Sequence, residues 1–126
     1  VLFGSVAAFA TQALINPMYA IHGMPRLREG QAPEDVARAL LAGDAGREHR
    51  QLHMVDAQGR IAAHTGSACV SWCGSVRGAD VSVAGNMLAG PAVVERTLQA
   101  FQFAQGTMAE RLLAVTASAR SLPARI

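Results

Sequence analysis

The feature that most constrains the fold is a hairpin signal near the middle of the chain. Two runs typical of strands, residues 51–55 and 60–65, flank the sequence Asp56-Ala57-Gln58-Gly59. An aspartate side chain stabilises the start of a tight turn, and a glycine readily adopts the positive φ needed at its end. The segment therefore predicts two antiparallel strands, which disfavours a doubly wound parallel sheet.

Prolines and glycines mark helices on both sides of this hairpin. Helices are predicted over residues 33–42 and 91–105. Each range begins with a proline, which suits the first helical turn, and is followed by a glycine, which suits the end of a helix. A third helix over residues 107–115 starts with a capping box, a threonine followed three residues later by a glutamate. Residues 18–27 predict a short helix that its internal glycine and proline, Gly23 and Pro25, should break.

Further strands are expected before and after the hairpin. Residues 6–12 are β-branched or small and read as a buried strand, and residues 81–86 alternate like a strand that ends in a polar turn. Residues 66–80 are rich in glycine and serine and predict a loop, with residues 68–72 as a short strand inside it. The resulting order of strand, helix, hairpin, strand and two helices predicts an α+β fold with antiparallel sheets.

Composition restricts the partners of this fold. The 126 residues fit a single domain, 1–126, and carry a formal net charge of +2 from eleven arginines, nine acids and no lysine. The arginines are scattered, whereas a nucleic-acid surface needs a clustered basic stripe with interleaved aromatics, so we expect no nucleic-acid partner. The longest apolar run near the start, Val6 to Ala10, is too short to span a bilayer, so no membrane partner is expected either.

The two cysteines say more about the cellular compartment of the protein than about a catalytic or metal-binding role. Two thiols form no disulfide framework, so the default is a reducing, cytoplasmic location, although the chain begins at Val1 and a missing N-terminal signal stays open. Cys69 and Cys73, with His64, could act as a thiol nucleophile and base or as part of a metal site. Their spacing matches no common zinc pattern, so the favoured interpretation is two small hydrophobic residues in a loop, with no metal and no cofactor.

Polar side chains gather where the expected strands end. Such residues either brace a neighbouring loop or line a polar pocket, because buried amides and hydroxyls must be hydrogen-bonded, and bracing is the more common outcome. If they line a pocket, the candidates are Thr11, Gln12, Asn16, His64, Thr65 and Asn86.

Several stretches together resemble one family. They are Ala10–Ala13, Asn16–Tyr19, Val55–Arg60, Ala62–Gly66, Gly85–Gly90 and Ala109–Leu113. In their order and spacing these stretches resemble an uncharacterised prokaryotic family of unknown function that is assigned by its fold to the N-terminal-nucleophile (Ntn) hydrolases. The resemblance implies a four-layer α-β-β-α sandwich with two stacked antiparallel sheets, of which this chain would form part.

The resemblance also implies a chemistry, namely amide hydrolysis by a threonine, serine or cysteine at the N-terminus, with its free α-amino group as the general base. Val1 offers no nucleophile, so no catalytic residue is assigned. We expect a fragment that lacks the family's opening strands and its closing strand, and that is inactive alone. The parent protein would act on small amide substrates, and the alternative is a non-catalytic ligand-binding or assembly module. Uncovered sheet edges and apolar faces would make the chain a homo-oligomer.

Overall fold

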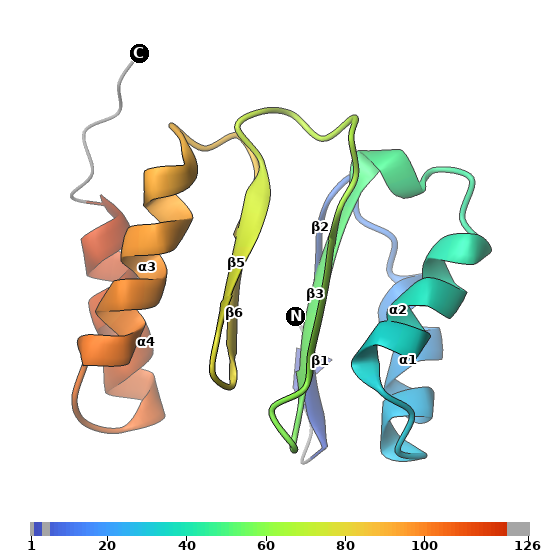
Figure 1. Ribbon diagram of the computed structural model, residues 1–126, viewed down its shortest axis with the longest axis horizontal. Helices are drawn as coiled ribbons and strands as arrows, with labels where there is room; N and C mark the ends of the chain where they lie inside the picture. The colour runs from blue at the N-terminus through green and yellow to red at the C-terminus, as the bar shows by residue number, and fades with distance from the viewer. Residues whose placement is uncertain (1, 4–5, 121–126) are drawn as a thin grey trace.

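The computed structural model describes residues 2–3 and 6–120 and has a mixed α+β fold with two antiparallel sheets. Figure 1 shows that the two sheets lie face to face, with α1 and α2 outside one sheet and α3 and α4 outside the other. The elements in chain order are β1 (Leu2–Phe3), β2 (Ala7–Ala13), α1 (Met18–Arg28), α2 (Pro33–Ala42), β3 (Arg50–Asp56), β4 (Ile61–Thr65), β5 (Gly74–Gly78), β6 (Val81–Gly85), α3 (Pro91–Phe103) and α4 (Met108–Arg120).

The predicted hairpin is confirmed as β3 and β4 in the four-stranded sheet, whose order is β1-β2-β3-β4. Asp56 Oδ1 accepts hydrogen bonds from the backbone N–H groups of Gln58 (3.0 Å) and Arg60 (2.9 Å), which closes the turn. Gly59 has a φ of 77°, and a Cβ there would lie 1.8 Å from Asp80 Oδ1. The positive φ therefore favours glycine at this position, and a side chain there would also have to displace the Asp80 carboxylate.

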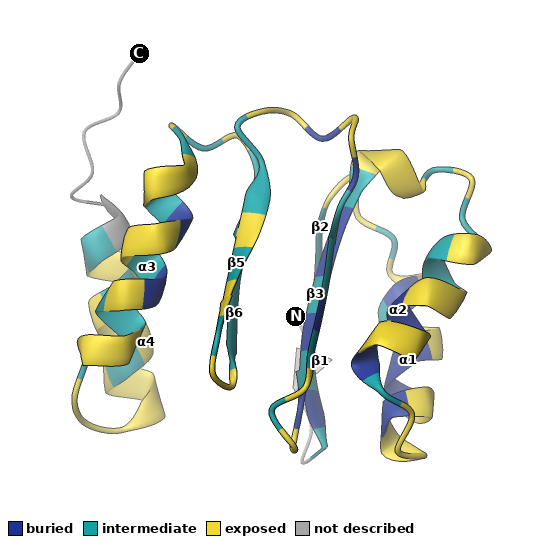
Figure 2. Cartoon of the chain, in the orientation of Figure 1, coloured by how far each residue is buried: buried dark blue, intermediate teal, exposed yellow. Residues whose placement is uncertain are grey.

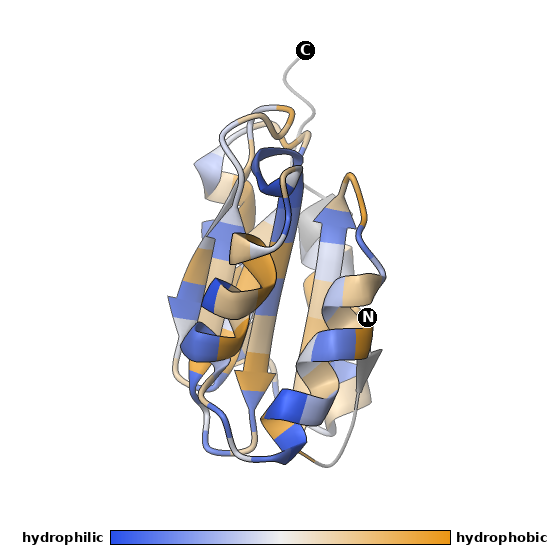
Figure 3. Ribbon diagram, turned by 90° about the vertical axis from the view of Figure 1, so that its right-hand side faces the viewer, coloured by the Kyte–Doolittle hydropathy of each residue, from blue (hydrophilic) through white to orange (hydrophobic). Residues whose placement is uncertain are grey.

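The main core lies between this sheet and α1 with α2. Phe9, Leu52 and Met54 are buried on the sheet face that these helices cover, and Val36 of α2 is fully buried against them. Because side chains alternate across a strand, the intervening residues of β2 and β3 face the second sheet. Figure 2 shows the buried residues concentrated on β2, β3 and the inward faces of α1 and α2, and Figure 3, which looks onto these helices, shows hydrophilic residues between hydrophobic ones along them.

The expected break in the first helix is wrong, because α1 continues through Gly23 and Pro25. A Cβ on Gly23 would lie 2.9 Å from Phe9 Cε2 and 3.2 Å from Leu40 Cδ1. The glycine therefore lets the helix approach the sheet closely. Tertiary packing of this kind outweighs the low helix propensity of glycine and proline.

The expected strand over residues 68–72 is also wrong, since the strand in this region is β5, which pairs with β6. Trp72 instead exchanges two backbone hydrogen bonds with Leu88: Trp72 N donates to Leu88 O (3.2 Å), and Leu88 N donates to Trp72 O (2.9 Å). Burial of Val94 and Leu98 holds α3 on the β5–β6 sheet. The glycines at both ends of β5 led to the prediction of a loop, because this strand is stabilised by β6 and α3 and not by a local sequence pattern.

The capping box at the start of α4 is confirmed. Thr107 N donates to Glu110 Oε2 (2.7 Å), and Glu110 N donates to Thr107 Oγ1 (3.3 Å). Arg111 links α4 to α3, because its guanidinium lies 4.1 Å from the centre of the Phe101 ring and donates to the Phe101 carbonyl (3.0 Å). Within the described residues, no helix has both the length and the apolar character needed to cross a membrane.

Candidate functional site

A network of neutral polar side chains lies between the two sheets and centres on Gln51, which is 0% exposed. Its Oε1 accepts from Gln12 Nε2 (2.7 Å) and from Asn86 Nδ2 (3.3 Å). Its Nε2 lies within donating distance of Thr65 Oγ1 (3.0 Å) and of the backbone carbonyls of Gly74 (3.1 Å) and Gly85 (3.0 Å). One buried amide thus connects β2, β4, β5 and β6.

The strand register explains why these residues meet. Gln12 pairs with Gln51 across β2 and β3, and Gln51 pairs with Thr65 across β3 and β4. Paired residues point to the same face of a sheet, so all three side chains face the β5–β6 sheet. Asn86 follows the end of β6 and approaches from the opposite side. The structure therefore brings together Gln12, Thr65 and Asn86 of the six sequence-predicted candidates.

Gln51, the centre of the network, is absent from those candidates. The signal was nevertheless present, because the turn at residues 56–59 fixes the hairpin register and thereby places Gln51 opposite Thr65. A glutamine at that position, on the same face as a predicted site threonine, could have been added to the set.

A pocket of about 580 Å³ opens beside this network. Its polar lining includes Gln12 and Asn86, and its apolar lining includes Leu14, Val70 and Met87, with the remainder supplied by Ala13, His49, Ala68 and Cys69. Each of the two amides uses one N–H on Gln51, so each keeps a carbonyl oxygen and a second N–H for a ligand. The pocket can therefore both donate hydrogen bonds to a small molecule and accept them from it.

The two cysteines do not provide a nucleophile for this pocket. Cys69 and Cys73 are free thiols, and Cys69 Sγ donates to the Arg50 carbonyl at 3.4 Å. Burial raises the pKa of the Cys69 thiol, so the reactive thiolate form is disfavoured. Within residues 2–3 and 6–120, no group of three or more metal-ligating side chains is close enough to hold a metal ion.

Thr11 and His64 face the opposite side of the sheet, towards α1 and α2. They flank Leu52 in the strand register, with Thr11 on β2 and His64 on β4. Thr11 Oγ1 is buried and has no hydrogen-bond partner among the described residues, whereas His64 Nε2 lies 3.0 Å from the carbonyl oxygen of Arg47. These two residues do not line the pocket between the sheets.

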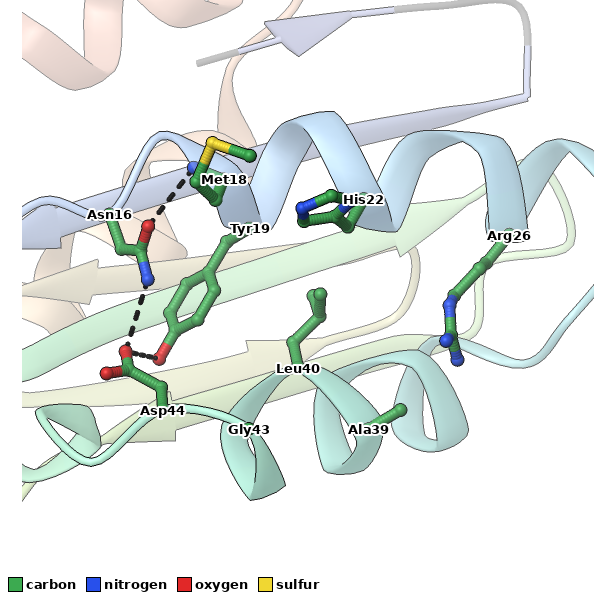
Figure 4. A pocket seen from close by; sticks show the side chains of 9 residues that line it. All are labelled: Asn16, Met18, Tyr19, His22, Arg26, Ala39, Leu40, Gly43 and Asp44. Carbon is green, nitrogen blue, oxygen red and sulfur yellow. Dashed lines mark hydrogen bonds between the residues drawn. The ribbon is translucent and has the colours of Figure 1, made fainter.

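Asn16 belongs to a second pocket, of about 360 Å³, between α1 and α2 (Figure 4). Asp44 is the hub of this region and accepts from Tyr19 Oη (2.5 Å), Asn16 Nδ2 (3.2 Å) and Gly46 N (2.8 Å). It also forms a charged hydrogen bond with Arg50 Nε.

The charge of Asp44 changes the titration of its neighbours. Its hydrogen bond with Arg50, together with that from Tyr19, holds the pKa of the Asp44 carboxyl well below its usual range. Burial and the adjacent carboxylate raise the pKa of Tyr19 to about 12. Four donors satisfy this carboxylate, which therefore has little capacity left to bind a ligand.

One further polar pair lies between the sheets. His53 Nδ1 is 2.9 Å from Ser82 Oγ, and both residues line a cavity of about 280 Å³ whose other walls are largely apolar. Burial lowers the pKa of His53, which favours the neutral imidazole. In the described parts of the chain no carboxylate contacts the other ring nitrogen, so the pair lacks the third group that orients a catalytic histidine.

Fold and site together define a class: an α+β domain with two antiparallel sheets and a pocket at their strand ends that is lined by the neutral amides of Gln12 and Asn86. Residues 2–122 match the family of unknown function DUF1028, and the chain belongs to that family. The predicted resemblance to a family of unknown function is thereby confirmed.

A solved structure from the same family closely resembles this fold. The crystal structure of protein SPO2555 from Silicibacter pomeroyi aligns with 92% of this chain at a TM-score of 0.87 and 33% sequence identity. The alignment covers 52% of the Silicibacter chain, so this chain spans about half the length of that relative. No curated protein matches the chain.

Proposed function

We propose that the chain is part of an Ntn-hydrolase-like domain whose pocket between the sheets binds small amide substrates. The observation that carries the proposal is the pair of carboxamides, Gln12 and Asn86, which are held by the buried Gln51 and line a pocket at the strand ends. Preorganised N–H donors of this kind stabilise negative charge that develops on a carbonyl oxygen. The face-to-face sheets between helical layers in Figure 1 agree with such a fold.

The proposed reaction in the whole protein follows the Ntn-hydrolase pattern. A threonine, serine or cysteine with a free α-amino group attacks the amide carbonyl and transfers its side-chain proton to that amino group. The carbon–nitrogen bond then breaks, the leaving amine takes up the proton, and water hydrolyses the acyl-enzyme to release the acid. Gln12 and Asn86 would orient the substrate carbonyl throughout.

The test is an assay of the full-length protein on small primary and secondary amides, with release of ammonia or amine as the readout. We expect Asn86→Ala to lower kcat/KM by about tenfold to a hundredfold, because the substrate carbonyl loses an orienting group. Asn16→Ala is the matched control, since Asn16 contacts Asp44 in the other pocket, and it should leave turnover within about twofold. No turnover, together with no threonine, serine or cysteine at the mature N-terminus, would rule out the hydrolase.

A non-catalytic module is the second candidate. It is favoured by the pocket lining, because burial raises the pKa of the Cys69 thiol and so disfavours the reactive thiolate. On this alternative, an amide ligand raises the melting temperature of the protein by mass action and is recovered unchanged.

The assembly role of such a module would involve α4, whose side chains Met108, Leu112 and Leu113 are exposed. Apolar side chains gathered on one helix favour a homo-oligomer. Light scattering at several protein concentrations tests this part of the proposal, and a stable monomer throughout would contradict it.

A further inference from the structure

We infer that the pocket beside Gln51 selects uncharged amides that carry an apolar substituent. The inference rests on the proposed function and narrows its substrate class. Three features of the pocket carry it: neutral hydrogen-bonding groups on the floor, large apolar side chains at the rim, and two rim residues held in an unfavourable backbone conformation.

The floor of the pocket matches a neutral amide better than an ion. Gln12 and Asn86 each retain one N–H donor and one carbonyl acceptor, and an amide group presents the complementary carbonyl and N–H. No lysine, arginine, aspartate or glutamate lines the pocket among the described residues, and His49 is the lining residue that can carry a positive charge. Arg50 donates to the Leu14 carbonyl at the edge, but it is already paired with Asp44. An ammonium ligand would therefore lose its hydration without gaining a counter-charge, and a carboxylate could gain one only from His49.

The rim of the pocket is apolar and open. Leu14, Val70 and Met87 are 61%, 63% and 71% exposed, although each is a large hydrophobic residue. They come from segments far apart in the sequence, after β2, before β5 and after β6. A backbone hydrogen bond from Met87 N to Val70 O (3.1 Å) holds two of these segments together. An apolar substituent of the ligand would contact all three side chains.

Backbone strain at the rim supports a functional role. Three described non-glycine residues have positive φ, and two of them, Ala13 (65°) and Met87 (53°), line this pocket. The third, Asp80, lies in the turn between β5 and β6. Residues other than glycine rarely adopt this conformation, and they keep it where the surrounding structure demands it, often at binding sites. The exposed side chain of Met87 is thus presented at the pocket by a strained backbone.

The first experiment compares the binding of three probes, hexanamide, acetamide and hexanoate, to the full-length protein by calorimetry. Burial of each methylene group is worth roughly a fourfold gain in affinity, so partial burial of the hexanamide chain should make it bind at least tenfold more tightly than acetamide. Hexanoate has the same chain with a charged head, and it should bind at least tenfold more weakly than hexanamide.

The second experiment distinguishes the contribution of the apolar rim to binding from that of the polar floor. Met87→Ala should weaken hexanamide binding by roughly fourfold or more, through the loss of apolar contact, and leave acetamide binding unchanged. Met108→Ala is the matched control, because Met108 is also an exposed methionine but lies at the start of α4. It should change neither affinity.

The outcomes distinguish this inference from the proposed function. Equal binding of acetamide and hexanamide, or no response to Met87→Ala, would overturn the role of the rim while leaving amide hydrolysis intact. Hexanoate binding as tightly as hexanamide would overturn the selection against charge. Failure of every amide to bind, with no turnover, would overturn the proposed function itself and this inference with it.

Discussion

Two polar clusters in this protein differ in charge and in how fully their hydrogen-bonding groups are used. The Asp44 cluster, outside the four-stranded sheet, pairs a carboxylate with Arg50, Tyr19 and Asn16. The Gln51 cluster, between the sheets, contains only amides and hydroxyls. Four donors satisfy the carboxylate of Asp44, whereas Gln12 and Asn86 keep donors and acceptors that face a pocket.

This difference separates bracing from binding. Asp44 is half-buried and its charge is paired and fully hydrogen-bonded, so its cluster braces α1, the loop after α2 and β3 against one another. A neutral network can leave hydrogen-bonding capacity at its edge at lower cost, provided that the edge reaches solvent or a ligand. We therefore propose ligand binding for the Gln51 cluster and structural support for the Asp44 cluster.

The largest effect is expected from Gln51→Leu, which removes the centre of the neutral cluster. Its loss leaves the half-buried carbonyls of Gly74 and Gly85 without their side-chain donor and the amides of Gln12 and Asn86 without their shared acceptor. Since each buried polar group left unpaired costs about 1–3 kcal/mol, we expect the free energy of unfolding to fall by at least about 3 kcal/mol. Urea denaturation measures this change.

The matched control is Gln99→Leu, the same substitution at an exposed position of α3. It should change the free energy of unfolding by no more than about 0.5 kcal/mol. If both variants behaved alike, Gln51 would not connect the two sheets.

Tyr19→Phe tests the charged cluster with an intermediate expected effect. The substitution removes the hydroxyl that donates to Asp44 and leaves the buried ring in place. A hydrogen bond to a charged group contributes about 1.5–3 kcal/mol, so the free energy of unfolding should fall by that amount. Amide binding should stay unchanged, because neither Tyr19 nor Asp44 lines the pocket beside Gln51. A loss of amide affinity in a folded Tyr19→Phe protein would refute the division of roles.

The pH dependence of stability tests whether a charged His53 is tolerated between the sheets. The expected change in the free energy of unfolding is smaller than that for Tyr19→Phe. Burial holds the pKa of His53 below the value of about 6.5 expected in the unfolded chain. The unfolded state therefore binds more protons in the range just below pH 6.5, and the free energy of unfolding decreases as the pH falls through it.

The measurement is the urea midpoint of the parent protein and of His53→Gln between about pH 7.5 and pH 5. The parent protein should lose stability over this range, and the variant should lose less, since glutamine cannot take up a proton. Identical pH profiles would show that protonated His53 is accommodated between the sheets.

Local signals in the sequence predicted the hairpin and much of the neutral cluster. The turn at residues 56–59 carries its own hydrogen bonds, so the aspartate and the glycine were sufficient to identify it. Gln12, Thr65 and Asn86 were found because each lies at or just after a strand end. These side chains meet because of the strand register, and the turn of the β3–β4 hairpin already places Thr65 opposite Gln51.

Features that depend on distant partners could not be found in this way. The strand β5 lies between glycines and is stabilised by β6 and α3, and α1 continues through Gly23 because Phe9 and Leu40 occupy the space beside it. The Asp44 cluster joins residues 25 and 28 positions apart in the sequence, with no local pattern to connect them. Thr11 and Gln12 are adjacent in the chain, and the alternation of side chains along β2 places them on opposite faces.

Substitution of Thr11 should give the smallest change in the free energy of unfolding. It tests whether Thr11, a polar residue near the end of β2, differs in role from its neighbour Gln12, which lines the pocket. The Thr11 hydroxyl is buried on the helix-facing side of β2 without a hydrogen-bond partner in the described residues. Valine has nearly the same shape and no hydroxyl, so Thr11→Val removes an unpaired polar group and should raise the free energy of unfolding by about 1 kcal/mol. Gln12→Ala, one residue along, should instead weaken amide binding, because it removes part of the pocket floor. If Thr11→Val weakened amide binding as much as Gln12→Ala does, the ligand would contact the helix-facing side of the sheet, and the pocket between the sheets would not be the binding site.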